Sequence, residues 1–187
     1  KGIRWYEARQ NGVIRSLKDR NGWAKNWQSQ MTVPLFKAPQ KIDEVVEKTD
    51  KIELSNTKSE HKLETQMLAK GGRKEGLSFL RSFLNIRGEN YTKQMSSPLT
   101  AFDSCSLLSS HLAYGTVSIR ETFQAAQSRK REIQSFEKLD RGNWPSALNS
   151  FLGRLRWHCH FIQKLEDEPR IEFENMHPVY DNLRSEK

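Results

Sequence analysis

The longest periodic pattern of apolar residues in the chain runs from Asn143 to Pro169. Its apolar side chains recur at spacings of three and four residues, which places them on one side of an α-helix. Asn143 can cap the helix start, Pro145 fits the first turn, and Pro169 ends the helix. The pattern predicts one long helix with a buried stripe. The stripe consists of Leu148, Phe151, Leu152, Leu155, Cys159, Ile162 and Leu165.

A second side of this helix mixes aromatic and cationic residues, namely Arg154, Trp157, His158 and Phe161. Side chains with an apolar stem and a polar tip commonly lie over the rim of a core. The same mixture of rings and charges also lines ligand sites. Both interpretations remain open from this stretch alone.

Two further helices are predicted in the second half of the chain. Residues 75–87 carry a broad apolar face, and Gly88 ends this helix. Ser118 and Glu121 form a capping box, which begins a helix of roughly twenty residues. That helix buries Ile119, Phe123, Ala126 and Ile133.

The segments between these helices are shorter and more polar. Residues 87–103 predict a loop that contains Tyr91. In residues 104–118, Ser104 or Ser106 caps a short helix that Gly115 ends. Its inward-facing residues are Leu107, Leu108, Leu112 and Ala113. The tail, residues 170–187, is expected to pack as loop and single turns.

The first part of the chain divides into two segments. Residues 1–32 show short helical patterns, with one apolar patch at 13–17 and a second made of Trp23, Trp27 and Met31. The tryptophan spacing favours packing over base stacking. Residues 33–72 are rich in charge, contain Pro34 and Pro39, and predict a polar linker with a short helix at 42–46. No strand pair is indicated after residue 73, so the expected fold class is all-α.

Composition and net charge indicate the kind of binding partner and the cellular compartment to expect. The 187 residues include 31 Lys and Arg against 23 Asp and Glu, a formal charge of +8 that favours an anionic partner. Cys105 and Cys159 are the only cysteines and fit reduced, buried thiols. We therefore expect an intracellular protein without a membrane span, cytoplasmic in bacteria and nuclear or organellar in eukaryotes.

Several kinds of catalytic site have little support. His158 and His160 flank Cys159, but alternate residues of a helix point about 200° apart and cannot share one metal ion. The serines lack a nucleophile elbow, and no glycine-rich phosphate loop is present. The serine cluster at 104–110 can either cap a helix or hold phosphate oxygens.

The stretch SCSLLSSHLAYGTVSIRE, residues 104–121, resembles the FAD-binding helical domain of the photolyase and cryptochrome family. In that family a Thr-Ser-Arg-Leu-Ser segment grips the FAD pyrophosphate, and a Tyr-Leu-Ala-x-Gly-x-x-Ser turn comes after it. Residues 5–31 are similar to the connector between the family's two domains. FLGRLRWHCHFIQKLEDEP, residues 151–169, is similar to the helix between the flavin and the DNA lesion pocket.

The resemblance implies a division of the chain into three parts. Residues 1–32 correspond to a connector that follows a missing α/β domain, and residues 33–72 correspond to a variable polar linker. Residues 73–187 correspond to the amino-terminal portion of the FAD-binding helical domain, which is incomplete without the family's carboxy-terminal helices. An isolated chain with half of the flavin site is expected to be inactive.

The resemblance also assigns site residues. The residues expected to bind FAD are Tyr91, Cys105, Ser106, Leu107, Leu108, Ser109, Phe151, Arg154 and His158. Those expected to face DNA are Arg154, Trp157 and Phe161, with Trp157 at the position of a tryptophan that stacks on damaged bases. Three departures weaken the match: Cys105 replaces threonine, Leu107 replaces arginine, and Arg154 replaces a carboxylate at the lesion.

Three functions are candidates, of which the resemblance implies the first two. The first is part of a photolyase that repairs pyrimidine dimers in DNA by light-driven electron transfer from reduced FAD. The second is a cryptochrome-like photoreceptor that keeps FAD without repair, which the changes at Leu107 and Arg154 favour slightly. The third is a basic helical interaction module without a cofactor.

Overall fold

The computed structural model describes residues 12–41, 70–181 and 183. These residues form helices and single turns and contain no β-strand, which confirms the all-α prediction for the described part of the chain. The short helix predicted at 42–46 lies outside them. The elements are α1 (Trp23–Thr32), α2 (Arg73–Asn85), η2 (Arg87–Asn90), α3 (Tyr91–Gln94), α4 (Ala101–Ser104), α5 (Ser109–Ala113), α6 (Ile119–Ser135), η3 (Lys138–Arg141), α7 (Trp144–Asp167), η4 (Pro169–Glu172) and η5 (Pro178–Tyr180).

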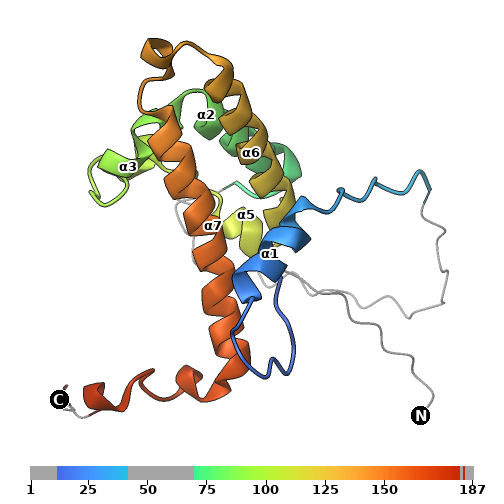
Figure 1. The fold of residues 1–187 in the computed structure, drawn as a ribbon, viewed down its shortest axis with the longest axis vertical. Coiled ribbons are helices and arrows are strands. Elements are labelled where there is room, and N and C mark those ends of the chain that lie inside the picture. The colour runs from blue at the N-terminus through green and yellow to red at the C-terminus, as the bar shows by residue number, and fades with distance from the viewer. Residues whose placement is uncertain (1–11, 42–69, 182, 184–187) are drawn as a thin grey trace, which may run out of the picture.

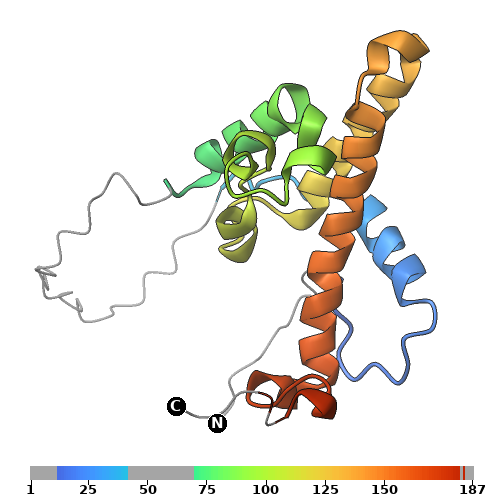
Figure 2. The ribbon, with the colours of Figure 1, turned by 90° about the vertical axis from the view of Figure 1, so that its left-hand side faces the viewer.

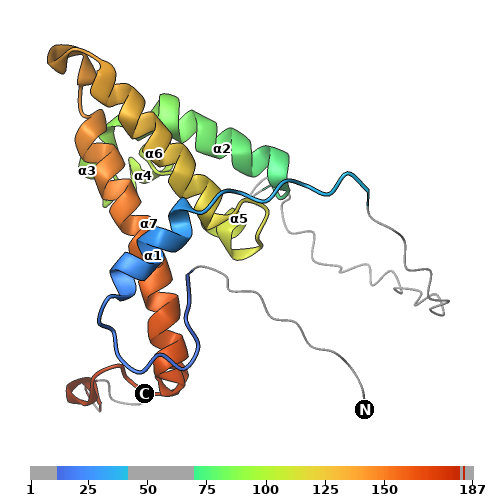
Figure 3. The ribbon, with the colours of Figure 1, turned by 45° about the vertical axis from the view of Figure 1, so that its right-hand side comes forward.

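The helix α7 is the axis of the fold (Figure 1). Its first half packs against α6, η2 and α3, while α2 packs on α6 and η2. Figures 2 and 3 show that its second half extends beyond these helices, with α1 and the loop before α1 lying alongside. No helix among the described residues is both long and apolar enough to cross a membrane.

The predicted long helix is confirmed almost to the residue. Pro145 lies in its first turn, and the stripe from Leu148 to Cys159 is buried. Asn143 occupies the cap position but makes no capping hydrogen bond. Its side-chain nitrogen donates to the Asn90 side-chain oxygen at 2.9 Å. Beyond Cys159 the stripe becomes shallow, and Leu165 is 46% exposed.

The start of α6 also agrees with the sequence prediction. The Ser118 hydroxyl accepts the Glu121 backbone N–H at 3.0 Å, as a capping residue does. The Glu121 carboxylate does not complete the box, since it forms a two-pronged ion pair with Arg73 at the start of α2. This exposed pair joins two helices that are remote in sequence.

The first helix buries the second apolar patch as predicted. Trp23, Trp27 and Met31 are at most 5% exposed. The ring of Trp27 packs edge-on against Phe123 of α6, with centroids 5.2 Å apart. The expected helical turn at residues 13–17 is absent: residues 12–22 form an irregular loop whose apolar side chains are half-buried. From here on we use the word connector for this loop alone, residues 12–22, which is a part of the longer segment that the resemblance assigns.

Several predictions for the middle of the chain need correction. Gly88 does not cap α2, which ends at Asn85. The expected loop, residues 87–103, contains the short helices η2, α3 and most of α4, with turns between α3 and α4. Neither Ser104 nor Ser106 caps the next helix, because Ser104 belongs to α4 and α5 starts at Ser109.

Further along, α5 buries His111 and only part of Leu112, while Ala113 is exposed. Gly115, at φ 66°, ends that helix as predicted. The tail forms single turns as expected, but most of its apolar side chains are exposed, Phe173 at 85%.

Gly88 is required by a close backbone approach. It is buried in η2, and a Cβ atom there would lie 2.5 Å from the Phe83 carbonyl oxygen. Since backbone cannot move aside, a side chain at this position forces η2 away from α2. The bend between α2 and α3 therefore depends on glycine.

Gly88→Ala should lower the free energy of unfolding by about 1–3 kcal/mol, because overpacking against backbone is costly. Gly153→Ala is the matched control. No heavy atom lies within 4 Å of a Cβ at Gly153, and this residue is inside α7. Its replacement should raise the free energy of unfolding by about 0.5–1 kcal/mol. Urea denaturation measures the free energy of unfolding of both variants. Equal effects of the two changes would contradict the close approach at Gly88.

Candidate functional site

The aromatic and cationic side of α7 is largely open to solvent in the structure. Trp157 is 53% exposed and Phe161 is 50% exposed, and Arg154 is also exposed. His158 lies nearer the core and is half-buried, and burial lowers the pKa of its ring. The three residues predicted to face DNA thus share one accessible side of a regular helix.

The exposed rings form a continuous cluster with one histidine. His160 lies 6.2 Å from Trp157 and 5.6 Å from Phe161, measured between ring centroids. The Trp157 and Phe161 rings are 5.8 Å apart. On its other side His160 meets the buried Trp23 edge-on at 5.8 Å. We call Trp157, His160 and Phe161 the ring cluster.

A second group of predicted residues gathers at the first half of α7. Tyr91 packs edge-on against Phe151 at 6.0 Å, and Phe83 fills the space beside both rings. Burial raises the pKa of the Tyr91 hydroxyl, the Cys105 thiol adds to this effect, and the Arg154 guanidinium opposes it. Tyr91, Cys105, Phe151 and Arg154 are therefore neighbours, as a common site requires.

Burial limits what two of these residues can do. Tyr91 is 8% exposed and Phe151 is 4% exposed, so both rings are part of the core. A ligand could reach only their edges. Burial likewise raises the pKa of the Cys105 thiol, which disfavours a thiolate nucleophile there.

The segment Cys105–Ser109 makes an unusual turn between α4 and α5. Leu107 has φ 58°, a left-handed conformation that is rare for a branched side chain. Leu108 comes next in the right-handed region, with φ −93° and ψ −2°, and its side chain is buried. Backbone of alternating handedness turns successive N–H groups toward one concavity, which is an anion-binding arrangement.

The donors of this turn are free within the described part of the chain. The backbone N–H groups of residues 106–109 and the hydroxyls of Ser106 and Ser109 have no hydrogen-bond acceptor there. Ser109 is exposed and Ser106 is half-buried. The residues predicted to grip phosphate thus retain their hydrogen-bonding capacity. The helix α5 has five residues, so the turn itself, and not a helix dipole, supplies this capacity.

Arg87 holds this turn in place, a role that the sequence did not suggest. Its guanidinium donates to the Cys105 carbonyl at 2.5 Å and to the Phe102 carbonyl at 3.4 Å. It also reaches back to the Phe79 carbonyl and the Ser82 hydroxyl of α2. The spacing of Arg87 from Cys105 gives no sequence signal, because their contact depends on the fold.

The sequence likewise suggested no role for Gln163, which fixes the connector to α7. Its side-chain oxygen accepts the Ile14 N–H at 2.7 Å and the Trp23 indole N–H at 3.3 Å. Its nitrogen donates to the Ile14 carbonyl at 2.9 Å and to Asp167 at 2.6 Å. All four hydrogen-bonding positions of this fully buried amide are satisfied. A polar residue one turn after Cys159 was the available signal.

Other features of the surface do not involve the predicted residues. A groove of about 530 Å³ lies where α1 and residues 35–38 meet the start of α6, and none of the predicted site residues lines it. The described residues contain no group of three histidine, cysteine or acidic side chains placed to hold a metal ion.

Comparisons of this chain with protein-family profiles, with curated proteins and with solved structures find no match.

Replacing Gln163 by methionine keeps the volume and removes all four hydrogen bonds. The Ile14 peptide and the Trp23 indole lose their partner, so the free energy of unfolding should fall by at least about 2 kcal/mol. Gln134→Met, at an exposed position of α6, should change it by less than about 0.5 kcal/mol. Urea denaturation compares the two, and a Gln163 effect as small as that of Gln134 would contradict the assigned role.

Proposed function

We propose that this chain is part of a flavoprotein of the photolyase and cryptochrome type, which binds FAD and presents α7 to damaged DNA. The proposal begins from the order of the motifs in the sequence. Its strongest structural support is the turn at Leu107, because a strained backbone conformation occurs inside the segment assigned to the phosphate grip.

The phosphate groups of FAD suit this turn. Ser106 and Ser109 offer free hydroxyl donors, and the bend at Leu107 offers backbone N–H groups. Arg87 fixes the turn to α2, so the donors need little reordering when a ligand binds. Leucine at position 107 removes the cation that the family has there, and backbone carbonyls already engage the Arg87 guanidinium, so we expect modest affinity.

The remaining flavin contacts would come from the region around Phe151. Arg154 is exposed there and can meet an anionic group, and His158 is half-buried with its pKa lowered by burial, so its ring is neutral near pH 7. Tyr91 and Phe151 supply a rigid wall through their packed rings. When bound and reduced, FAD supplies the electron that light transfers to a pyrimidine dimer.

The DNA-facing role falls to the outer side of α7. Trp157 and Phe161 present flat, half-exposed rings, which suits stacking against unpaired bases. Arg154 is exposed on the same side of the helix and can contact phosphates. The formal charge of +8 favours the same partner.

A photoreceptor without repair activity is the second candidate. Arg154 is the observation that favours it, because a guanidinium cannot replace a carboxylate as hydrogen-bond acceptor or proton source at a lesion. Flavin photoreduction without loss of dimers from irradiated DNA would select this candidate.

Flavin binding is tested in the full-length protein of which we propose this chain to be a part, because the chain by itself would hold only half of the flavin site. FAD is titrated into that purified protein, and flavin absorbance and fluorescence are recorded. The double change Ser106→Ala and Ser109→Ala should weaken FAD binding by about tenfold, since it removes hydrogen bonds to charged phosphate oxygens. Ser110→Ala is the matched control, being exposed and adjacent but outside the assigned grip. No binding by the unaltered protein would refute the flavin proposal, and equal loss in both variants would refute the assigned grip.

Trp157→Ala should weaken binding of dimer-containing DNA by about tenfold or more, because each stacked base contributes about 1–3 kcal/mol. FAD affinity should not change. Phe173→Ala removes a ring that is 85% exposed on the tail and serves as control. Fluorescence anisotropy of labelled DNA gives the affinities. Equal loss of FAD and DNA binding would mean that Trp157 acts structurally.

A further inference from the structure

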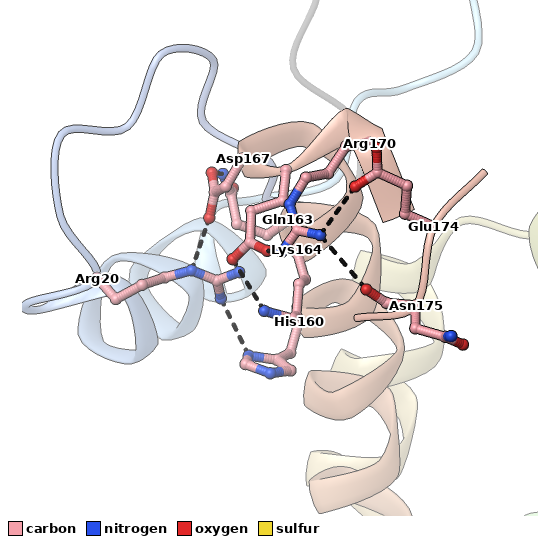
Figure 4. A network of polar contacts seen from close by, with 9 residues as sticks. Arg20, His160, Gln163, Lys164, Asp167, Arg170, Glu174 and Asn175 are labelled. Carbon is pink, nitrogen blue, oxygen red and sulfur yellow. Dashed lines mark hydrogen bonds and ion pairs between the residues drawn. The ribbon is translucent and has the colours of Figure 1, made fainter. Parts of the chain in front are cut away.

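The connector docks on the second half of α7 through a small polar network (Figure 4). The Arg20 side chain donates from Nε to the Asp167 carboxylate at 2.7 Å. Its Nη1 lies 3.1 Å from Nδ1 of His160. Arg20 thus meets one anionic and one aromatic partner on the same helix, beside the buried amide of Gln163.

The contact between Arg20 and His160 fixes the state of the imidazole. A guanidinium is only a donor, so Nδ1 of His160 must accept with its lone pair. The ring is then neutral and carries its proton on Nε2. A proton on Nδ1 would set two donors against each other across 3.1 Å, and a ring protonated on both nitrogens would add a second positive charge.

His160 also joins two parts of the molecule. Its ring contacts the buried Trp23 at the start of α1 and the exposed Trp157 and Phe161 on α7. Arg20 in turn lies over the Trp23 ring, 5.8 Å from its centroid. A movement of His160 would therefore change contacts both at the connector and in the ring cluster.

The charged groups around His160 act in opposite directions. Arg20 from the connector and Lys164 from α7 disfavour a protonated ring, and Asp167 favours it. The neighbour from α1 is the uncharged ring of Trp23. Burial is the largest influence, and together these groups lower the pKa of His160.

We propose that His160 is a pH-sensitive latch, which holds the connector on α7 while its ring is neutral and releases Arg20 when the ring takes up a proton. The latch would control how firmly residues 12–22 and the ring cluster are held. This inference goes beyond the proposed function and does not depend on flavin or DNA binding.

The lowered pKa sets the direction of the pH effect. The unlatched ring binds a proton more readily than the latched ring, so acid favours release. Docking of the connector through His160 has its full strength above the ordinary histidine pKa of about 6.5. It weakens as the pH falls through that value toward the lower pKa of the docked ring.

The backbone amide of Ile14 reports on the latch, because its N–H donates to Gln163 only while the connector is docked. Hydrogen exchange of this amide is measured by NMR from about pH 7.5 to about pH 5 and corrected for the intrinsic exchange rate. Protection should fall by about threefold or more in acid. His160→Gln keeps an acceptor that cannot titrate, and protection in this variant should not change with pH.

Two controls separate the latch from general acid effects. His177→Gln removes another histidine ring, on the tail, and should leave the acid-induced loss at Ile14 unchanged. The ¹⁵N shifts of the His160 ring in the unaltered protein should show a proton on Nε2 at neutral pH. A proton on Nδ1, or the same pH profile at Ile14 with and without His160, would overturn the proposal.

Discussion

The amide of Gln163 determines how the second half of α7 is covered. The half of α7 beyond α3 is covered by α1 and by the connector, which has no regular structure. Such chain carries peptide groups that need hydrogen-bond partners when they are buried. Gln163 provides them by bonding both the N–H and the carbonyl of Ile14. Without this residue both groups of the Ile14 peptide would lose their partner, and docking of the connector would cost free energy.

This docking makes the two sides of α7 different. The side toward Trp23 is sealed by the connector, whereas the side with Trp157 and Phe161 remains open among the described residues. At the other end of α7, packing of Tyr91 and Phe151 closes the core, and Arg87 sets the strained turn at Leu107 next to it. A rigid helix thus separates a region of free hydrogen-bond donors from a region of exposed rings.

The sequence predicted the features that depend on periodicity and on neighbours along the chain. The extents of α6 and α7, the Ser118 cap and the buried face of α1 could all be read from it. It failed where distant segments decide the structure. The roles of Arg87 and Gln163 come from contacts across the fold, and Gly88 is needed because Phe83 approaches it, not because a helix ends there. Of the predicted site residues, Tyr91, Cys105, Phe151 and Arg154 come together, while Trp157 and Phe161 form their own cluster.

The exposure of Trp157 bears on the two interpretations of the helix side that the sequence left open. A side chain that lies over the rim of a core makes its contacts with buried residues below it. The ring contacts of Trp157 are instead with His160 and Phe161, and half of its surface meets solvent. Such exposed apolar area costs free energy and contributes little to packing. Two adjacent rings on one helix, both in contact with His160, therefore leave flat surfaces open to solvent, which the proposed stacking role requires.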